Sequence, residues 1–232
     1  MNERVEKAKY VLDSITNIMD FQEFGTGQRL WWCFCFGNLL EYIADKTFSF
    51  DYDIDLGVLY DECDQDKLIS AFEGHGYKSK VTCVNDVTGK ALNIHFKPIG
   101  DYIKDTPTLD VFFWYEHKGI LYHTYDEKKT GNKMLEEYKL KGVPKEWLCP
   151  DKETIDRERN IGVPGREQML NDRGTWRFPI FDDASSLTFR APYKIGHLLD
   201  EWYGPTWRFR QYYKGQSMSR WVKKIKSFKE LR

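Results

Sequence analysis

The stretch that decides the fold is Asp51-Tyr52-Asp53-Ile54-Asp55-Leu56-Gly57-Val58. Successive side chains of a β-strand point to opposite faces of a sheet, so this stretch predicts a strand with one apolar face and one acidic face. Asp51, Asp53 and Asp55 share the acidic face. Like charges this close repel one another unless a cation or a shared proton relieves them. Because Mg²⁺ takes carboxylates and substrate phosphates as ligands, the pattern favours metal-assisted phosphoryl chemistry.

A further carboxylate lies in an apolar strand downstream. Asp110 belongs to Leu109-Asp110-Val111-Phe112-Phe113-Trp114, where a lone carboxylate is costly unless it is paired, protonated or bound to metal. Taken separately, an Asp-x-Asp pattern is typical of a solvated edge strand, and Asp110 of a turn at the end of a strand. Taken together, Asp53, Asp55 and Asp110 predict one metal site.

Composition indicates a globular protein that has no strong field for nucleic acid. The chain has 232 residues, 31% of them charged, a formal net charge of -1 and a mean hydropathy of -0.64, which fits one domain with a sizeable core. The longest apolar run, residues 30–40, is too short to cross a bilayer. No apolar block follows the charged first residues, so we expect no signal peptide. The five scattered cysteines show no zinc-like spacing and favour a reducing cytoplasm.

Periodicity predicts an α/β (α+β) domain over residues 1–232, with a mixed sheet flanked by helices. After a first helix and a buried strand, Asn38 is expected to cap a short helix. The expected helices are residues 3–19, 39–44, 65–72 and 192–203, and the expected strands are residues 29–36, 53–59, 77–84, 91–97, 109–115 and 120–125.

Two segments stand apart from the predicted core, which covers about residues 28–125 and 178–208. Residues 126–177 form a polar insertion that we expect to be irregular with short helices, either a lid or binding loop or a surface insertion without a role. The apolar stripe in residues 216–232 predicts a basic amphipathic helix. We expect it to dock on the domain; the alternative is peripheral contact with the inner face of a membrane.

Four motifs in this order resemble the nucleotidyltransferase fold, and more narrowly the LicD family, which includes fukutin and fukutin-related protein. The family shows Gly-Ser/Thr-Leu-Leu after a strand, then Asp-x-Asp-x-Asp-hydrophobic-Gly, then an Asp followed by apolar residues, and its fukutin branch has a late Pro-led helix. The matching pieces here are Gly37-Asn38-Leu39-Leu40, residues 51–57, residues 110–114, and Ala191-Pro192-Tyr193-Lys194 with residues 198–205.

The resemblance implies a transferase that moves a phosphorylated alcohol from a CDP-linked donor to a glycan or lipid-linked saccharide hydroxyl and releases CMP. The alcohols include choline, glycerol and ribitol. Asp53 and Asp55 would hold Mg²⁺ (or Mn²⁺) against the donor diphosphate. Asp110 would complete the site and accept the proton of the attacking hydroxyl.

Further residues are candidates for donor binding. Gly37 would let the backbone approach the phosphates, and a helix N-terminus there favours anions. Asn38 stands where the family has Ser or Thr, and Lys46 would replace the arginine that the family carries late in the short helix, although an exposed lysine is the plainer interpretation. The donor-binding candidates are Gly37, Asn38, Lys46, Asp51, His95 and Arg177. His95 is otherwise a structural histidine, and Arg177 a surface charge.

Two other functions are compatible with these residues. The first is a nucleotidyltransferase that moves a nucleotide from an NTP to a small molecule. The second is a non-catalytic carbohydrate-binding protein that uses the abundant aromatic side chains, which are 16% of the residues.

Overall fold

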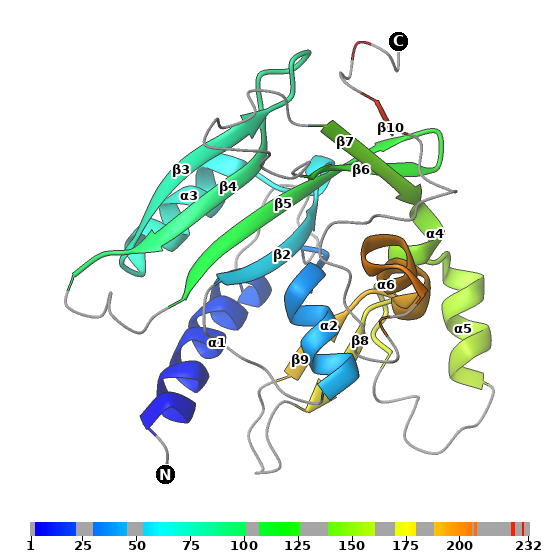
Figure 1. The fold of residues 1–232 in the computed structure, drawn as a ribbon, viewed down its shortest axis with the longest axis horizontal. Helices are drawn as coiled ribbons and strands as arrows, with labels where there is room; N and C mark the ends of the chain where they lie inside the picture. The colour runs from blue at the N-terminus through cyan, green and yellow to red at the C-terminus, as the bar shows by residue number, and fades with distance from the viewer. Residues whose placement is uncertain are drawn as a thin grey trace.

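A computed structural model describes residues 3–21, 30–45, 53–100, 107–125, 139–160, 170–179, 188–205, 207, 224–225 and 229. It has a mixed sheet with helices on both sides, which confirms the α+β prediction (Figure 1). The helices are α1 (Glu3–Phe21), α2 (Phe36–Asp45), η1 (Tyr60–Glu62), α3 (Gln65–Gly74), α4 (Lys145–Leu148), α5 (Lys152–Asn160) and α6 (Ile195–Tyr203). The strands are β1 (Trp32–Phe34), β2 (Asp53–Leu59), β3 (Tyr77–Val84), β4 (Ala91–Pro98), β5 (Thr108–His117), β6 (Ile120–Tyr125), β7 (Lys139–Pro144), β8 (Trp176–Pro179), β9 (Thr188–Ala191) and β10 (Lys224–Ile225).

The long strand β5 organises the main sheet. Over the described residues the strand order is β1-β2-β5-β6-β7-β10, and β3 joins through β4, which also pairs with β5. The β2–β5 pair is parallel, and the other described pairs of this sheet are antiparallel. A parallel pair needs a crossover connection, and η1, α3, β3 and β4 supply it. β2 and β5 therefore meet although their paired residues, such as Asp55 and Asp110, lie 55 positions apart in the sequence.

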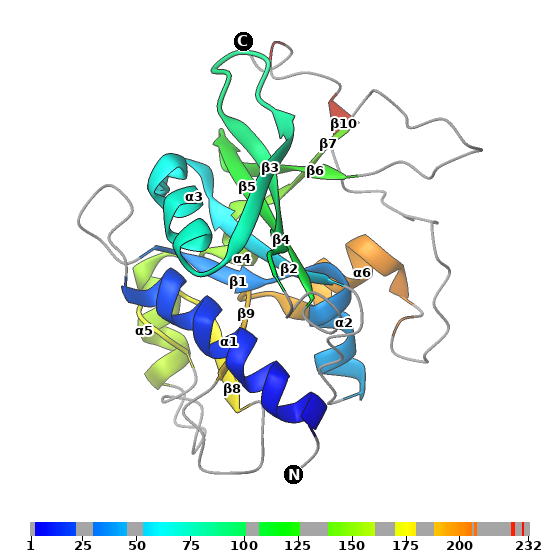
Figure 2. The ribbon, with the colours of Figure 1, turned by 90° about the vertical axis from the view of Figure 1, so that its left-hand side faces the viewer.

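The two faces of β2 have different surroundings. Ile54, Leu56 and Val58 are completely buried in a core that also contains side chains of α1 and α3. Figure 2 shows α3 on one side of the sheet and α6 on the other. The alternation of strand side chains thus turns the aspartates of β2 toward the side of α2 and α6, where exposure increases toward Asp53.

Several predicted elements are confirmed at their predicted bounds: residues 53–59, 77–84 and 120–125 are β2, β3 and β6. The β5–β6 hairpin closes through Lys118 and Gly119, whose φ angles are 49° and 76°. Two consecutive positive φ angles suit the right-handed twist of a hairpin, and they explain the Gly at this turn.

The insertion and the tail differ from expectation. Residues 139–144 form β7, which pairs with β6, so the polar insertion adds a strand to the main sheet besides α4 and α5. Lys224 and Ile225 pair with β7 as β10 and are not helical, contrary to the prediction for residues 216–232. The edge of β7 offers unpaired backbone groups that another strand satisfies. The rest of residues 216–232, apart from Lys229, lies outside the described residues. In the part of the chain that is described, no helix is long and apolar enough to cross a membrane.

Candidate metal centre

The parallel pairing of β2 and β5 brings the predicted aspartates together. Asp55 lies directly opposite Asp110 in the register, and Asp53 lies two residues earlier on the same face of β2. One carboxylate oxygen from each of the three residues lies within 4.8 Å of the others. Asp53 is exposed, while Asp55 and Asp110 are partly buried. The three side chains therefore form a small acidic cluster that is open to solvent at Asp53.

The electrostatics of the cluster favour a cation or protons. Burial raises the pKa of Asp55 well above its ordinary value, and the negative charges of Asp53 and Asp110 raise it further. A hydrogen bond from the backbone N–H of Gly37 partly offsets this rise in the pKa of Asp55. Three carboxylates offer hard oxygen ligands only, and this donor set suits Mg²⁺ or Mn²⁺. The cluster thus has the chemistry that the predicted ion requires.

His95 is a direct neighbour of the cluster. It lies opposite Asp110 in the β4–β5 register, and its Nδ1 atom is 3.1 Å from Oδ1 of Asp110. Burial raises the pKa of Asp110, whereas His95 and a hydrogen bond with the Asn93 side chain lower it. β4 therefore supplies two side chains that orient the Asp110 carboxyl group. His95, a donor-binding candidate, thus lies beside Asp110, and its contact with a donor stays a prediction.

Asn38 does not cap a helix. α2 begins at Phe36, and the Asn38 side chain is turned toward the backbone of β2. Its Oδ1 accepts a hydrogen bond from the Asp55 N–H at 2.6 Å, and its Nδ2 donates to the Asp53 carbonyl at 3.2 Å. β1 ends at Phe34, so this part of β2 needs another partner for its backbone groups. Asn38 positions the aspartate strand, and its contact with a donor stays a prediction.

Gly37 lies at the opening of α2, beside the cluster. Its N–H interacts with the Asp55 carboxylate, and a methyl group added at its Cα would meet nothing within 4 Å. The open space at this position is consistent with the predicted approach of a phosphate to the backbone, which remains a prediction.

Of the other donor-binding candidates, the described residues include Arg177. Lys46 and Asp51 fall outside the described residues. Arg177 is on β8, opposite Arg190 in a separate two-stranded sheet, and none of the described hydrogen bonds or ion pairs connects it with the acidic cluster. Arg173, four residues before Arg177, is bound to the Glu62 carboxylate.

Tyr203 and Glu41 were missed as site residues. Burial raises the pKa of the Tyr203 hydroxyl, and the charges of Asp55, Asp53 and Glu41 add to this rise. Tyr203 ends α6 and Glu41 lies one turn after Gly37 in α2, so both helices border the cluster. The signal for Tyr203 was its place just before Gly204 in the fourth motif, but sequence alone does not say that this helix end approaches β2.

The acidic cluster is separate from a hollow that lies elsewhere among the described residues. That hollow, of about 270 Å³, is lined by residues that include Leu59, Glu62, Cys149 and Arg173. Leu59 is at the opposite end of β2 from Asp53. Because a strand rises about 3.3 Å per residue, roughly 20 Å separate the two places, and the hollow takes no part in the acidic site.

Comparisons with known proteins leave the family open. No protein-family model matches the chain, and no curated protein matches its sequence significantly. Any function must therefore be argued from the residues and their geometry.

Proposed function

We propose that the protein is a Mg²⁺-dependent transferase of phosphorylated alcohols, with a CDP-linked donor and a saccharide acceptor. The observation that carries the proposal is the meeting of Asp53, Asp55 and Asp110 from two parallel strands, with their carboxylate oxygens within 4.8 Å of one another. The four motifs that resemble the LicD family give the donor class. The alcohol, whether choline, glycerol, ribitol or a similar group, depends on a pocket that these residues do not define.

The three aspartates would hold Mg²⁺ or Mn²⁺. When bound, the ion neutralises charge on the donor diphosphate and on the transferred phosphoryl group. The acceptor hydroxyl oxygen forms the new bond to phosphorus, the bond from phosphorus to the CMP oxygen breaks, and CMP leaves with that electron pair. The hydroxyl proton passes to the pair formed by Asp110 and His95, in which Oδ1 of Asp110 lies 3.1 Å from Nδ1 of His95.

The experiment compares donor classes directly. The protein is incubated with CDP-choline, CDP-ethanolamine, CDP-glycerol and CDP-ribitol, and separately with free NTPs, with Mg²⁺ or with EDTA. Binding is measured by calorimetry, and the products CMP and pyrophosphate are quantified. We expect Mg²⁺-dependent binding of one CDP-alcohol and release of CMP. Pyrophosphate from an NTP would instead identify a nucleotidyltransferase.

A matched pair of variants tests the site. Asp53→Ala removes a ligand of the cluster, whereas Asp61→Ala removes an exposed carboxylate from η1, beyond the far end of β2. Donor binding and CMP release should be lost in the first variant and kept in the second. Saccharide binding that neither EDTA nor Asp53→Ala affects, without any CMP release, would indicate a non-catalytic carbohydrate-binding protein.

A further inference from the structure

The face of the sheet that carries the acidic cluster continues onto β4 and β3, where the charge reverses. Asp55 lies opposite Asp110, Asp110 lies opposite His95, and His95 lies opposite Lys80. These four side chains form a row across β2, β5, β4 and β3. Residues directly opposite each other in a sheet have side chains on the same face, so the row runs from two acidic groups to a basic group.

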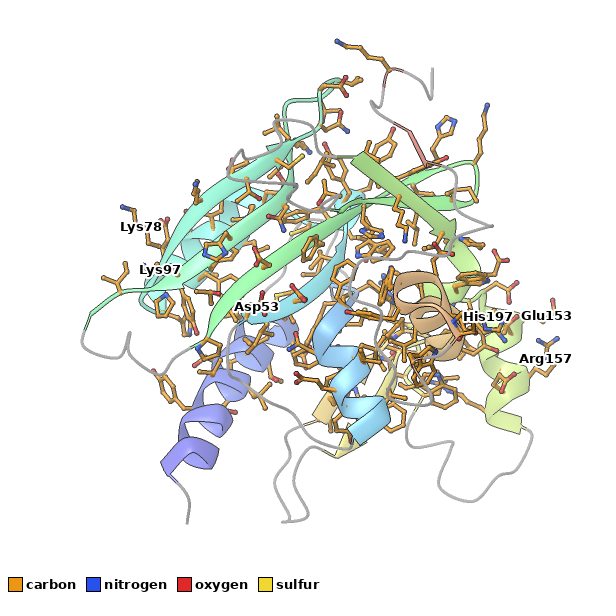
Figure 3. The ribbon with its side chains drawn as sticks, in the orientation of Figure 1. Asp53, Lys78, Lys97, Glu153, Arg157 and His197 are labelled. Atoms are coloured by element: carbon orange, nitrogen blue, oxygen red, sulfur yellow. The ribbon has the colours of Figure 1, made fainter. Side chains whose placement is uncertain are left out.

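A second row adds two more lysines. Lys97 lies two residues after His95, and Lys78 lies directly opposite Lys97. Lys78, Lys80 and Lys97 are all exposed, and we call these three residues the lysine strip. Figure 3 shows Lys78 and Lys97 on β3 and β4, to one side of Asp53 on β2.

The lysine strip is electrostatically unfavourable without a partner. Like charges directly opposite each other in a sheet are destabilising, as Lys78 and Lys97 are. Among the described residues, no ion pair joins any of the three lysines to a carboxylate, whereas Lys141, Lys145 and Arg173 each have an acidic partner. An anion that binds across β3 and β4 would relieve this repulsion.

The position of the strip indicates what the anion belongs to. Lys97 on β4 lies one strand from Asp110, whereas Lys78 and Lys80 on β3 lie roughly 10 to 14 Å from the two strands that carry the aspartates, because neighbouring strands are about 4.8 Å apart. This distance is too large for the diphosphate that the acidic cluster would hold, and it suits a second charged group on the other substrate. We propose that Lys78, Lys80 and Lys97 bind a phosphate or carboxylate of an anionic acceptor saccharide. The inference rests on the proposed function, because it assigns the donor to the acidic cluster.

A nucleic acid fits the strip less well than a saccharide does. Proteins that hold single strands combine cations with aromatic side chains on which bases stack. On this face the described residues of β3 and β4 include no Phe, Tyr or Trp, and the whole chain has a net charge of -1.

The test compares two triple variants that lose the same charge. Lys78→Gln/Lys80→Gln/Lys97→Gln removes the strip, and Lys67→Gln/Lys118→Gln/Lys152→Gln removes three exposed lysines from α3, the β5–β6 turn and α5. The probe is a fluorescein-labelled phosphorylated dextran oligosaccharide, with unmodified dextran as the neutral reference. Anisotropy titrations are made at low salt, in Mg²⁺ and in EDTA.

We expect the strip variant to bind the phosphorylated probe about tenfold more weakly than the wild type, and the control variant to change by less than about twofold. Neutral dextran should not distinguish the proteins. Equal weakening in both triple variants would overturn the proposal, since it would reflect net charge alone. Two further results would overturn it: equally tight, strip-dependent binding of a single-stranded oligonucleotide, or loss of Mg²⁺-dependent CDP binding in the strip variant.

Failure of this inference is distinguishable from failure of the proposed function. Probe binding requires no turnover and is measured in EDTA as well. If no CDP-alcohol is ever used but the probe depends on the strip, the transferase proposal is wrong and an anion-binding surface remains. If CMP is released from a CDP-alcohol but probe binding is the same with and without the lysine strip, only the acceptor assignment is wrong.

Discussion

Two groups of charged side chains in this protein differ in their neighbours: one group lies beside opposite charges, and the other beside like charges. Lys141 and Glu201 lie in the interior, with side chains 4% and 3% exposed, and Nζ is 3.2 Å from Oε1. Arg190 likewise pairs with Asp20 and lies over the Trp32 ring. In the acidic cluster, by contrast, three carboxylates face one another. Buried charges are normally paired or bound to metal. The first group follows this rule through its ion pairs, and the second group would follow it only in the proposed metal site.

The register of β2 and β5 maintains the unfavourable cluster. The opposite face of β2 contributes three completely buried side chains, Ile54, Leu56 and Val58. A slip by one residue would move these side chains out of the core and onto the face that carries the aspartates. The apolar face therefore holds Asp53 and Asp55 beside Asp110 in spite of their repulsion. A bound cation would relieve that repulsion.

The largest effect should come from Asp55→Asn, a substitution within the acidic cluster that removes one of its three carboxylates. We expect CMP release to fall by about 10³-fold or more, because a ligand to the ion is lost. We expect the free energy of unfolding to rise, because burial and two neighbouring carboxylates oppose ionisation of Asp55. Turnover and urea denaturation of the same protein samples check both parts. Near wild-type turnover, or clear destabilisation, would contradict the metal assignment.

Among the interior ion pairs, Glu201→Ala should reduce the free energy of unfolding by about 3 to 5 kcal/mol. The substitution removes the Glu201 carboxylate from the buried Lys141 ammonium group. The control is Glu116→Ala, which breaks the exposed Lys145–Glu116 pair, whose side chains are 41% and 40% exposed. That change should cost about 1 kcal/mol or less. Urea denaturation compares the two variants, and equal losses would show that burial does not distinguish these ion pairs.

A third comparison concerns the glycines beside the acidic cluster. A methyl group on Gly57 would come within 2.7 Å of both Cys35 Sγ and Trp114 Nε1, whereas one on Gly37 would meet nothing within 4 Å. Gly57→Ala should therefore destabilise the protein by about 1 to 3 kcal/mol. Gly37→Ala should leave stability unchanged or slightly higher, because alanine favours a helix. Thermal unfolding separates the two outcomes, and tolerance of Gly57→Ala would refute the close packing of β2 on Trp114.

The smallest expected effect is a change in the Mg²⁺ dependence of Tm with pH. The pKa of Asp55 is raised from 3.8 in the folded protein, so the folded state binds more protons than the unfolded state above about pH 4. This contribution to stability is present at low pH and is lost as pH rises through the raised pKa. Mg²⁺ replaces those protons, so it should raise Tm by about 2 to 5 °C at pH 8 and by less at pH 5.

Asp55→Asn serves as the control for the pH measurement. Subtracting its Tm profile from that of the wild type gives the contribution of the Asp55 carboxyl group, including its coupling to Asp53 and Asp110. The difference should shrink as pH falls and as Mg²⁺ is added. A Mg²⁺ effect on Tm that is the same in both proteins and at both pH values would place the ion elsewhere.

Local pattern was sufficient for much of the fold. The alternation in residues 53–59 predicted β2, its buried face and its acidic face. It also indicated that Asp110, in a second apolar strand, belongs with Asp53 and Asp55. Local pattern was not sufficient for β7, because Lys141 looks like a solvent-exposed residue until Glu201, sixty positions later, neutralises it. The same polar appearance led to the prediction of an irregular insertion.

What the sequence determined by itself is what depends on neighbours along the chain: strand periodicity, hairpin turns and the placement of three carboxylates on extended segments. Tertiary structure alone decided that Asn38 holds the backbone of β2, that Tyr203 approaches Asp55, and that Lys78, Lys80 and Lys97 continue the acidic face. Each of these depends on the register between strands or on the docking of a helix. Register and docking are set by burial of apolar side chains far apart in the chain, so no local pattern encodes them.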